Sequence, residues 1–124
     1  MSDKSAQKVT VFATHGPEDP ERATLPFLMA NAALVEGCES VVILQGPGVL
    51  LAKQGIVEHV FGATLPALSE QLASFLGGGG RLLACTPCLR ERKIEPEMLV
   101  EGVELTNAAH VIKEVTESSA TLNY

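Results

Sequence analysis

Short runs rich in apolar and β-branched residues alternate along the chain with longer segments in which apolar positions recur at helical spacing. Strands are predicted over residues 9–13, 40–45, 81–84, 103–105 and 120–124. Strands that alternate with helices over the whole length are typical of a mostly parallel sheet covered by helices on both faces. The pattern therefore predicts an α/β fold and leaves the strand order open.

The first helical segment begins with a good capping sequence, because Asp19 is a favourable N-cap and Pro20 suits the first helical position. Pro26 lies inside this segment, where proline costs about 3 kcal/mol, so we expect either a kink or a start near Thr24. The face expected to pack on the sheet consists of Leu25, Leu28, Met29 and Ala32.

Five further helical regions are expected. Residues 49–54 are predicted to form two helical turns, and short helices are predicted to start at Pro87 and Pro96. A helix capped by Thr64 would end at the glycines 77–80. Its expected inner face is Leu65, Leu68, Leu72 and Leu76. A last helix, capped by Thr106 or Asn107, would have the inner face Ala108, Val111, Ile112 and Val115.

The 124 residues fit one domain, which we assign to residues 8–124 after a flexible leader, residues 1–7. Apolar residues make up 46% of the chain and charged residues 19%, an ordinary globular balance. No apolar run reaches the ~18 residues that span a bilayer, and the first residues lack the apolar region of a secretory signal. We therefore expect a cytoplasmic protein without a membrane partner.

The net charge of −6 argues against nucleic acid as a partner, because nucleic-acid-binding proteins present basic surfaces. Three cysteines in a cytosolic chain favour thiol chemistry or metal ligation over a structural disulfide framework. A structural zinc site normally needs four ligands, and no second cysteine pair is present. Neither His59 nor His110 has a motif around it. We accordingly predict no metal and no cofactor.

Candidate chemistry lies in the segment Cys85-Thr86-Pro87-Cys88. Cys85 directly follows the third strand, and ligand sites in parallel sheets collect beyond the carboxyl ends of the strands. A helix starting at Pro87 and the basic residues 90, 92 and 93 would favour a thiolate at Cys85. Cys88 could resolve a sulfenic acid, close a disulfide or fill space, whereas Cys38 is interpreted as a packed small hydrophobe.

The cysteine segment resembles the DsrE/DsrF-like family, which includes sulfur-relay subunits. Members of that family have a cysteine after a central strand and then an Arg-Gly-aliphatic segment. Cys85, Arg92 and Ile94 match those positions, and Lys93 replaces the usual glycine. Two further segments are similar to the family in the right order. They are the first loop, with Thr14, Gly16, Glu18, Asp19 and Ala23, and the Gly48-Val49-Leu50-Leu51 segment.

The resemblance implies a five-stranded α/β fold, assembly into trimers or hexamers, and a persulfide-carrying cysteine, here Cys85. The leading hypothesis is a sulfur carrier or sulfurtransferase component that relays sulfane sulfur between donor and acceptor proteins. Thr14, His15 and Gly16 would line its pocket, because the first strand should end on the same side of the sheet, and Arg92 would add positive charge. The alternatives are a dithiol oxidoreductase that uses Cys85 and Cys88, and a non-catalytic oligomeric binding module.

Overall fold

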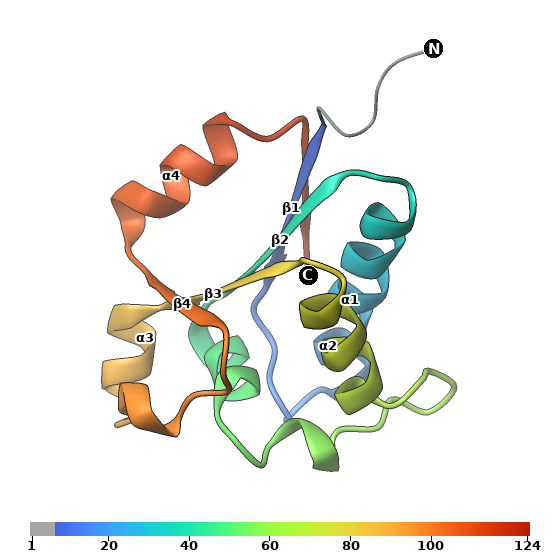
Figure 1. Ribbon diagram of the computed structural model, residues 1–124. Helices are drawn as coiled ribbons and strands as arrows, with labels where there is room; N and C mark the ends of the chain where they lie inside the picture. Colours follow the sequence, from blue (N-terminus) through green and yellow to red (C-terminus); the bar gives the residue numbers. More distant parts are fainter. Residues whose placement is uncertain (1–6) are drawn as a thin grey trace.

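The computed structural model describes residues 7–124, which form one five-stranded sheet in which all neighbouring strands are parallel. The strand order is β4-β3-β2-β1-β5. The strands are β1 (Lys8–Ala13), β2 (Glu39–Leu44), β3 (Arg81–Cys85), β4 (Val103–Thr106) and β5 (Ala120–Asn123). The predicted α/β class, with helices on both faces of the sheet, is confirmed (Figure 1).

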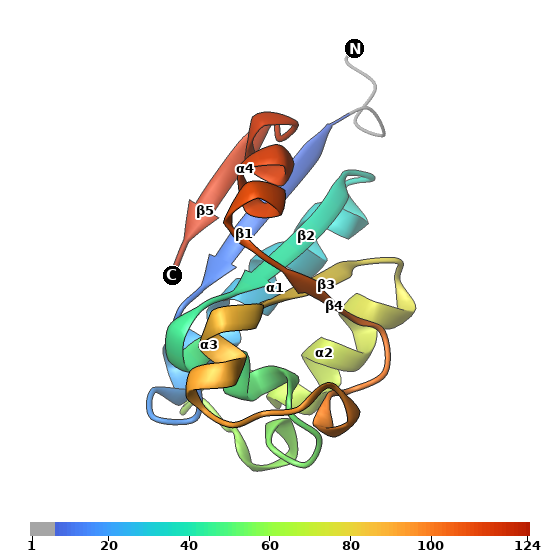
Figure 2. The same cartoon turned by 90° about the vertical axis from the view of Figure 1, so that its left-hand side faces the viewer.

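The helices divide between the two faces of the sheet. Helices α1 (Pro20–Val35) and α2 (Leu68–Gly77) lie together on one face, and α4 (Ala108–Thr116) lies on the opposite face (Figures 1 and 2). Helix α3 (Thr86–Glu91) follows β3 directly. The connections contain the 3₁₀ helices η2 (Gly46–Ala52), η3 (Val57–His59) and η4 (Pro96–Met98). Among the helices of residues 7–124, none has the length and apolar character needed to cross a membrane.

Successive residues of the central strands point to opposite faces of the sheet, as the pleat requires. Val42 and Leu44 of β2 belong to the large core beneath α1 and α2. Val41 and Ile43 of the same strand form a small second cluster with Leu83, against which Val111 of α4 packs. Because both faces of β2 are covered, this strand is an almost continuous apolar run.

Helix α1 begins where the sequence predicts, since the Asp19 side chain accepts a hydrogen bond from the Arg22 N–H and Pro20 is the first helical residue. The helix continues through Pro26, so the predicted late start is wrong. The predicted inner face is also wrong, because Met29 is 41% exposed. The buried residues of α1 are instead Ala23, Thr24, Pro26, Phe27, Ala30 and Ala33. Small residues along this face bring the helix close to the sheet, and Pro26 lies against the core.

Helix α2 starts later than expected. It runs from Leu68, with Ala67 at its N-cap, so Leu65 lies outside the helix and the predicted Thr64 cap is wrong. Pro66 explains this start, because the residue before a proline is disfavoured in helical conformation. The inner face includes Phe75, whose ring meets that of Phe27 edge to face at a centroid distance of 5.8 Å.

Helix α4 is capped by Asn107, whose side chain accepts a hydrogen bond from the His110 N–H. The predicted apolar inner face is wrong in part, because Ile112 is 61% exposed and Ala108 is also exposed. The fully buried residue of α4 is Glu114, which is 5% exposed. A charged residue, rather than an apolar stripe, therefore seats this helix on the sheet.

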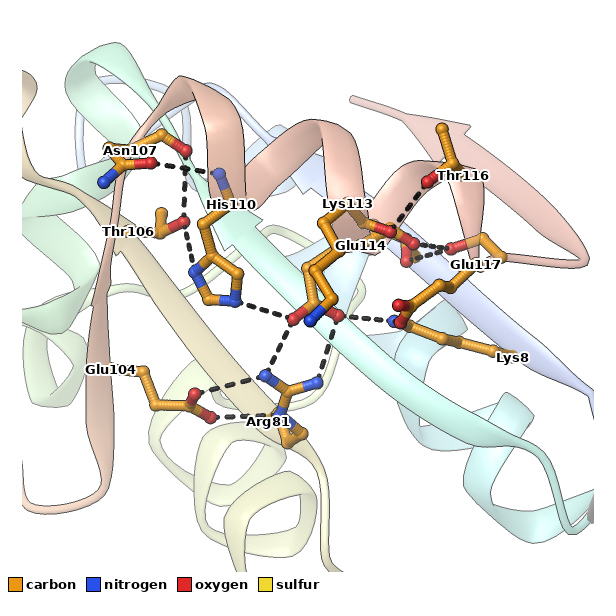
Figure 3. A network of polar contacts seen from close by, with 12 residues as sticks. Lys8, Arg81, Glu104, Thr106, Asn107, His110, Lys113, Glu114, Thr116 and Glu117 are labelled. Carbon is orange, nitrogen blue, oxygen red and sulfur yellow. Dashed lines mark hydrogen bonds and ion pairs between the residues drawn. The ribbon is translucent and has the colours of Figure 1, made fainter.

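Glu114 lies at the centre of a cluster of ion pairs that joins α4 to β1, β3 and β4 (Figure 3), and Arg81 of this cluster also lies 3.7 Å from Glu39 of β2. Its carboxylate binds the Lys8 ammonium from β1 and both terminal nitrogens of Arg81 from β3, at 2.9 and 3.0 Å. Arg81 also makes a two-point contact with Glu104 of β4, with both distances 3.1 Å. Burial raises the pKa of Glu114, but hydrogen bonds from Arg81 and Lys8 outweigh burial and lower this pKa to about 2.

We predict that Glu114→Gln lowers the free energy of unfolding by about 3–5 kcal/mol, because the change leaves the Lys8 ammonium and the Arg81 guanidinium without their buried counter-charge. Glu117→Gln is the matched control, since Glu117 is half-exposed and lies 3.8 Å from Lys8. It should cost less than about 1 kcal/mol. Urea unfolding at pH 7 measures both. Equal losses in the two variants would contradict the assigned role of Glu114.

The same pair of proteins tests the sign of the pH dependence. A carboxyl whose folded pKa lies below its unfolded value contributes stability above the unfolded pKa and loses it as pH falls through the folded pKa. For Glu114 that window runs from about pH 4.5 down to about pH 2. Wild-type stability should fall across it, and Glu114→Gln should show a smaller fall.

Candidate thiol site

Cys85 is the last residue of β3 and the N-cap of α3, so the backbone turns from strand to helix at this residue. It pairs with Thr106, the last residue of β4, across the parallel ladder. Positions 81, 83 and 85 of β3 share one face of the sheet by alternation, and this is the face that α4 covers. The half-buried Cys85 side chain therefore lies on the α4 side, at the carboxyl end of the sheet.

Cys88 lies one helical turn further on and contacts Cys85 directly. The two sulfur atoms are 2.6 Å apart, within hydrogen-bonding contact. Cys88 Sγ also accepts a hydrogen bond from the Gly46 N–H at 3.3 Å. Both cysteines, like Cys38, are free thiols. The segment thus holds a dithiol pair whose sulfurs are already in contact.

The electrostatic environment differs from the sequence-based expectation of a thiolate with a lowered pKa. Burial raises the pKa of the Cys85 thiol, and the side-chain hydrogen bond with Cys88 raises it further. The positive charge of Arg92 acts in the opposite direction but is the weaker influence. Cys85 is therefore a thiol that needs a proton acceptor before it can act as a nucleophile.

A pocket of about 320 Å³ opens beside Cys85 on the α4 side. Its lining is mostly apolar, with Thr106, Gln45 and Asn107 as the polar side chains other than the thiol. The full lining is Gln45, Cys85, Pro87, Thr106, Asn107, Ala108, Val111 and Ile112. The volume suits a small group or the end of an extended side chain, and the apolar walls limit the access of water to the sulfur.

The end of α3 accounts for the positions that follow the cysteines. Lys93 has a φ of 57°, the one positive φ at a non-glycine residue among residues 7–124. The Lys93 and Ile94 N–H groups bond the carbonyls of Arg90 and Leu89, which is the Schellman arrangement of a helix end. A left-handed residue at this position favours glycine, so the structure explains the glycine that the resembled family has there.

Arg92 caps this helix and lies close to the thiols. Its Nη1 donates to the Cys88 carbonyl oxygen at 3.1 Å. That contact holds the guanidinium near α3, where its charge lowers the pKa of Cys85. The sequence-predicted binding residue Arg92 and the two cysteines therefore lie together.

The structure places Thr14, His15 and Gly16 after β1, two strands from β3, and none of them lines the Cys85 pocket. The Thr14 hydroxyl donates to the Tyr124 carbonyl oxygen at 2.7 Å, and His15 Nδ1 lies 3.4 Å from that hydroxyl. The Gly16 N–H donates to the Glu18 carboxylate at 2.8 Å. The Thr14 contact ties the loop to the residue that follows β5, and the other two contacts are local to the loop.

The loop after β1 nevertheless supports the site through the loop after β2. A Cβ on Gly48 would lie 2.2 Å from the Ala13 carbonyl oxygen, and one on Gly16 would lie 2.4 Å from the Pro47 carbonyl oxygen. The two loops can pack this closely only because both positions are glycine. The second loop then presents the Gly46 N–H to Cys88.

Sequence reasoning missed the other residues around the thiols, namely Gln45, Thr106 and the residues of α4. Gln45 follows β2 and Thr106 ends β4, and these are the two strands adjacent to β3. Helix α4 is the helix that follows β4. The strand order would have revealed Gln45 and Thr106, because they stand at the carboxyl ends of the two neighbours of β3. Among residues 7–124, no group of three His, Cys, Asp or Glu side chains is arranged to hold a metal ion.

The fold and the site define an α/β protein with a cysteine pair at the carboxyl edge of a parallel sheet. The sequence profile of the DsrE/DsrF-like family matches residues 7–124. The chain therefore belongs to the DsrE/DsrF-like family, in which sulfur relay is a general theme.

Relatives and solved structures agree with this assignment. The chain is 34% identical over 110 residues to the uncharacterized protein MK0008 of Methanopyrus kandleri, covering 89% of this chain and 88% of that protein. It is 31% identical over 117 residues to the uncharacterized protein MJ0989 of Methanocaldococcus jannaschii, covering 94% and 99%. The ychN protein from E. coli has a similar fold, with a TM-score of 0.80 at 17% identity over 95% of this chain and 99% of that one. MTH1491 from Methanobacterium thermoautotrophicum also has a similar fold, with a TM-score of 0.75 at 19% identity, over 95% of this chain and 99% of that one.

We predict that Gly48→Ala destabilises the protein by several kcal/mol, because the new Cβ would overlap the Ala13 carbonyl oxygen and push the two loops apart. Gly77→Ala is the matched control. Gly77 ends α2 with open space around it, so alanine should leave the stability unchanged or raise it by up to about 1 kcal/mol. Thermal unfolding of both variants checks this, and a tolerated Gly48→Ala would rule out the tight loop contact.

Proposed function

We propose that the protein is a sulfur carrier or sulfurtransferase component in which Cys85 accepts sulfane sulfur as a persulfide and passes it to the thiol of a partner. Membership of the DsrE/DsrF-like family supports the general role in sulfur relay. The position of Cys85 carries the specific assignment, because this half-buried thiol lines an apolar pocket at the carboxyl edge of the sheet.

The transfer needs only thiols and sulfane sulfur. The Cys85 thiolate attacks the outer sulfur of a donor persulfide, R–S–SH. A new bond forms between Cys85 Sγ and that sulfur, the old S–S bond breaks, and the donor leaves as R–S⁻, which takes up a proton. Cys85 then carries –S–SH, and an acceptor thiolate removes the outer sulfur in the same way. The apolar pocket favours this cycle because it shields the persulfide from water.

Cys88 provides a second outcome, which its contact with Cys85 favours. Its thiolate can attack Cys85 Sγ of the persulfide, form a Cys85–Cys88 disulfide and release HS⁻. Equally, the reduced pair can act as a dithiol oxidoreductase, which was the alternative from the sequence. In that reaction a disulfide substrate, R–S–S–R, is reduced to two R–SH while the two cysteines become oxidised. The 2.6 Å separation of the sulfurs is the observation that favours this second function.

Intact-mass measurement after incubation with a persulfide donor separates the two functions. For the carrier, we expect a gain of one sulfur that dithiothreitol removes, and that is lost in Cys85→Ser. Cys88→Ser should keep the added sulfur and hold it longer than wild type, because the internal attack on Cys85 Sγ is no longer possible. Cys38→Ser is the matched control and should load like wild type.

Other mass changes would favour a different function or reject Cys85 as the carrier. A loss of two hydrogens that requires both Cys85 and Cys88, with no sulfur gained in any variant, would favour the dithiol oxidoreductase. Loading that survives Cys85→Ser would reject Cys85 as the carrier. No change of mass in any variant would reject both reactions and leave the oligomeric binding module.

We propose further that the protein is a homo-oligomer, a trimer or hexamer, in which the α4 side of the sheet contacts another copy. Ile112 is 61% exposed on α4, the single nine-residue helix that covers this face. Large exposed apolar side chains on a half-covered face favour association. A second copy seated there would shield the Cys85 pocket from water.

For this interface, we predict that Ile112→Asp lowers the molar mass in solution, measured by light scattering coupled to gel filtration, to that of a smaller assembly or a monomer. Val35→Asp is the matched control, because Val35 is 87% exposed on α1, which lies on the opposite face of the sheet. It should leave the mass unchanged. A wild-type protein that runs as a monomer, or an assembly that Ile112→Asp leaves intact, would contradict the proposed interface.

A further inference from the structure

A chain of hydrogen bonds runs from Thr106 through His110 to the buried carboxylate of Glu114 (Figure 3). Thr106 also lines the Cys85 pocket. The Thr106 hydroxyl lies 2.8 Å from Nδ1 of His110, and Nε2 of the same ring lies 2.8 Å from Glu114 Oε2. His110 and Glu114 are one helical turn apart on α4, so both side chains lie on the same side of that helix. The imidazole ring thus bridges the pocket wall and the ion-pair cluster.

The cluster determines the direction of these hydrogen bonds. The Glu114 carboxylate is ionised, because Lys8 and Arg81 bind it, and an ionised carboxylate can only accept. Nε2 of His110 must therefore donate to this carboxylate, and in the tautomer whose single hydrogen is on Nε2, Nδ1 is an acceptor. The Thr106 hydroxyl donates to Nδ1 at 2.8 Å in preference to the Asn107 carbonyl oxygen at 3.4 Å.

Thr106 is also the residue of β4 that stands beside Cys85. The two residues are paired across the β3–β4 ladder, and both line the same pocket. Neighbouring strands lie about 4.8 Å apart, so paired residues on one face are adjacent. With its hydrogen directed to His110, the Thr106 oxygen has free lone pairs to accept a proton from a thiol in the pocket.

We propose that Thr106 and His110 form a proton relay that removes the proton from the Cys85 thiol, with Glu114 holding the ring in the required tautomer. Thr106 takes the proton from the thiol and His110 takes the Thr106 proton, whereas Glu114 is a positioning residue that acts through the His110 ring. The relay deepens the proposed function, since it assumes only that Cys85 is the reacting thiol.

The proton transfer balances within the relay. The Cys85 S–H proton moves to the Thr106 oxygen as the Thr106 O–H proton moves to Nδ1 of His110. The products are a thiolate, a neutral threonine and an imidazolium ring whose charge faces the Glu114 carboxylate. The Thr106 hydroxyl can then donate to the new thiolate. The raised pKa of Cys85 is the reason why such an acceptor is needed.

Other charged and titratable groups surround this path and belong in the interpretation of any pH profile. Cys88 and Arg92 lie beside Cys85, on α3 and at its end. Lys8 and Arg81 bind Glu114, and Glu104 binds Arg81. Cys88 is replaced in all the variants used below, and the other groups are present in all of them. Differences between the variants therefore report on the relay.

The test is the rate of Cys85 alkylation by iodoacetamide between pH 6 and pH 9, which requires no sulfur transfer. All variants carry Cys88→Ser, so that one thiol of the pair is followed by site-resolved mass spectrometry. Thr106→Val keeps the shape of the side chain and removes the hydroxyl. We expect it to slow alkylation at pH 7 by at least about tenfold, which is less than the roughly 10²–10⁴-fold that a positioned general base typically contributes, and to move the pH profile upward. His110→Gln should have the same effect, and Thr106→Ser should recover most of the rate.

Thr116→Val is the matched control, because the Thr116 hydroxyl bonds only the Lys113 carbonyl oxygen on the exposed side of α4. It should leave the profile unchanged. A Thr106→Val profile that superimposes on that of the parent would overturn the relay, as would equal slowing by Thr106→Val and Thr106→Ser. If His110→Gln does not fold, the valine and serine variants of Thr106 still decide the question. If Cys85 does not load sulfur but Thr106→Val still slows its alkylation, the proposed function is rejected and the relay stands.

Discussion

The buried carboxylate of Glu114 is the interaction on which one whole face of the molecule depends. It binds Lys8 of β1 and Arg81 of β3, and through Arg81 it reaches Glu104 of β4. Helix α4 has no broad apolar stripe against the sheet, so this cluster, with Val111 on a small patch of the sheet, keeps the helix in place. A buried charge that has two cationic partners is satisfied, whereas the loss of one partner is costly. The face is therefore held by specific geometry rather than by apolar area.

That geometry connects the stability of the fold to the chemistry of the thiols. The ion pairs lie toward the amino ends of β3 and β4, and Cys85 and Thr106 lie at the carboxyl ends. Helix α4 spans the distance between them, with Glu114 in the cluster and His110 one turn closer to the pocket. A helix packed through apolar side chains could shift or rotate on the sheet without a large penalty. Ion pairs at 2.9–3.1 Å allow much less freedom, so the imidazole is kept in one orientation.

The two cysteines differ in their surroundings although they are three residues apart. Cys85 lines the pocket, and its pKa is raised by burial and by the contact with Cys88. Cys88 faces the Gly46 N–H, which belongs to the loop after β2. The sulfur proposed to react with a substrate and the sulfur proposed to resolve the product thus have different neighbours. The proposed sulfur relay and the alternative dithiol reaction differ in which sulfur is attacked: the outer sulfur of the persulfide in the relay, and Cys85 Sγ when Cys88 forms the disulfide.

The sequence by itself determined the α/β class, the five strands, the Asp19 cap and the placement of Cys85 at a strand end, and it narrowed the cap of the last helix to Thr106 or Asn107, because periodicity, capping residues and turn residues act locally. It misassigned the inner faces of α1 and α4, since alanines and a glutamate are buried there in place of larger apolar residues. His110 carried no signal at all. Its partners Thr106 and Glu114 are close in sequence. The Glu114 carboxylate, however, is kept ionised by its contacts with Lys8 and Arg81, which are far away along the chain. Only the tertiary structure brings those charges together, because ion pairing depends on distance in space and not on separation in sequence.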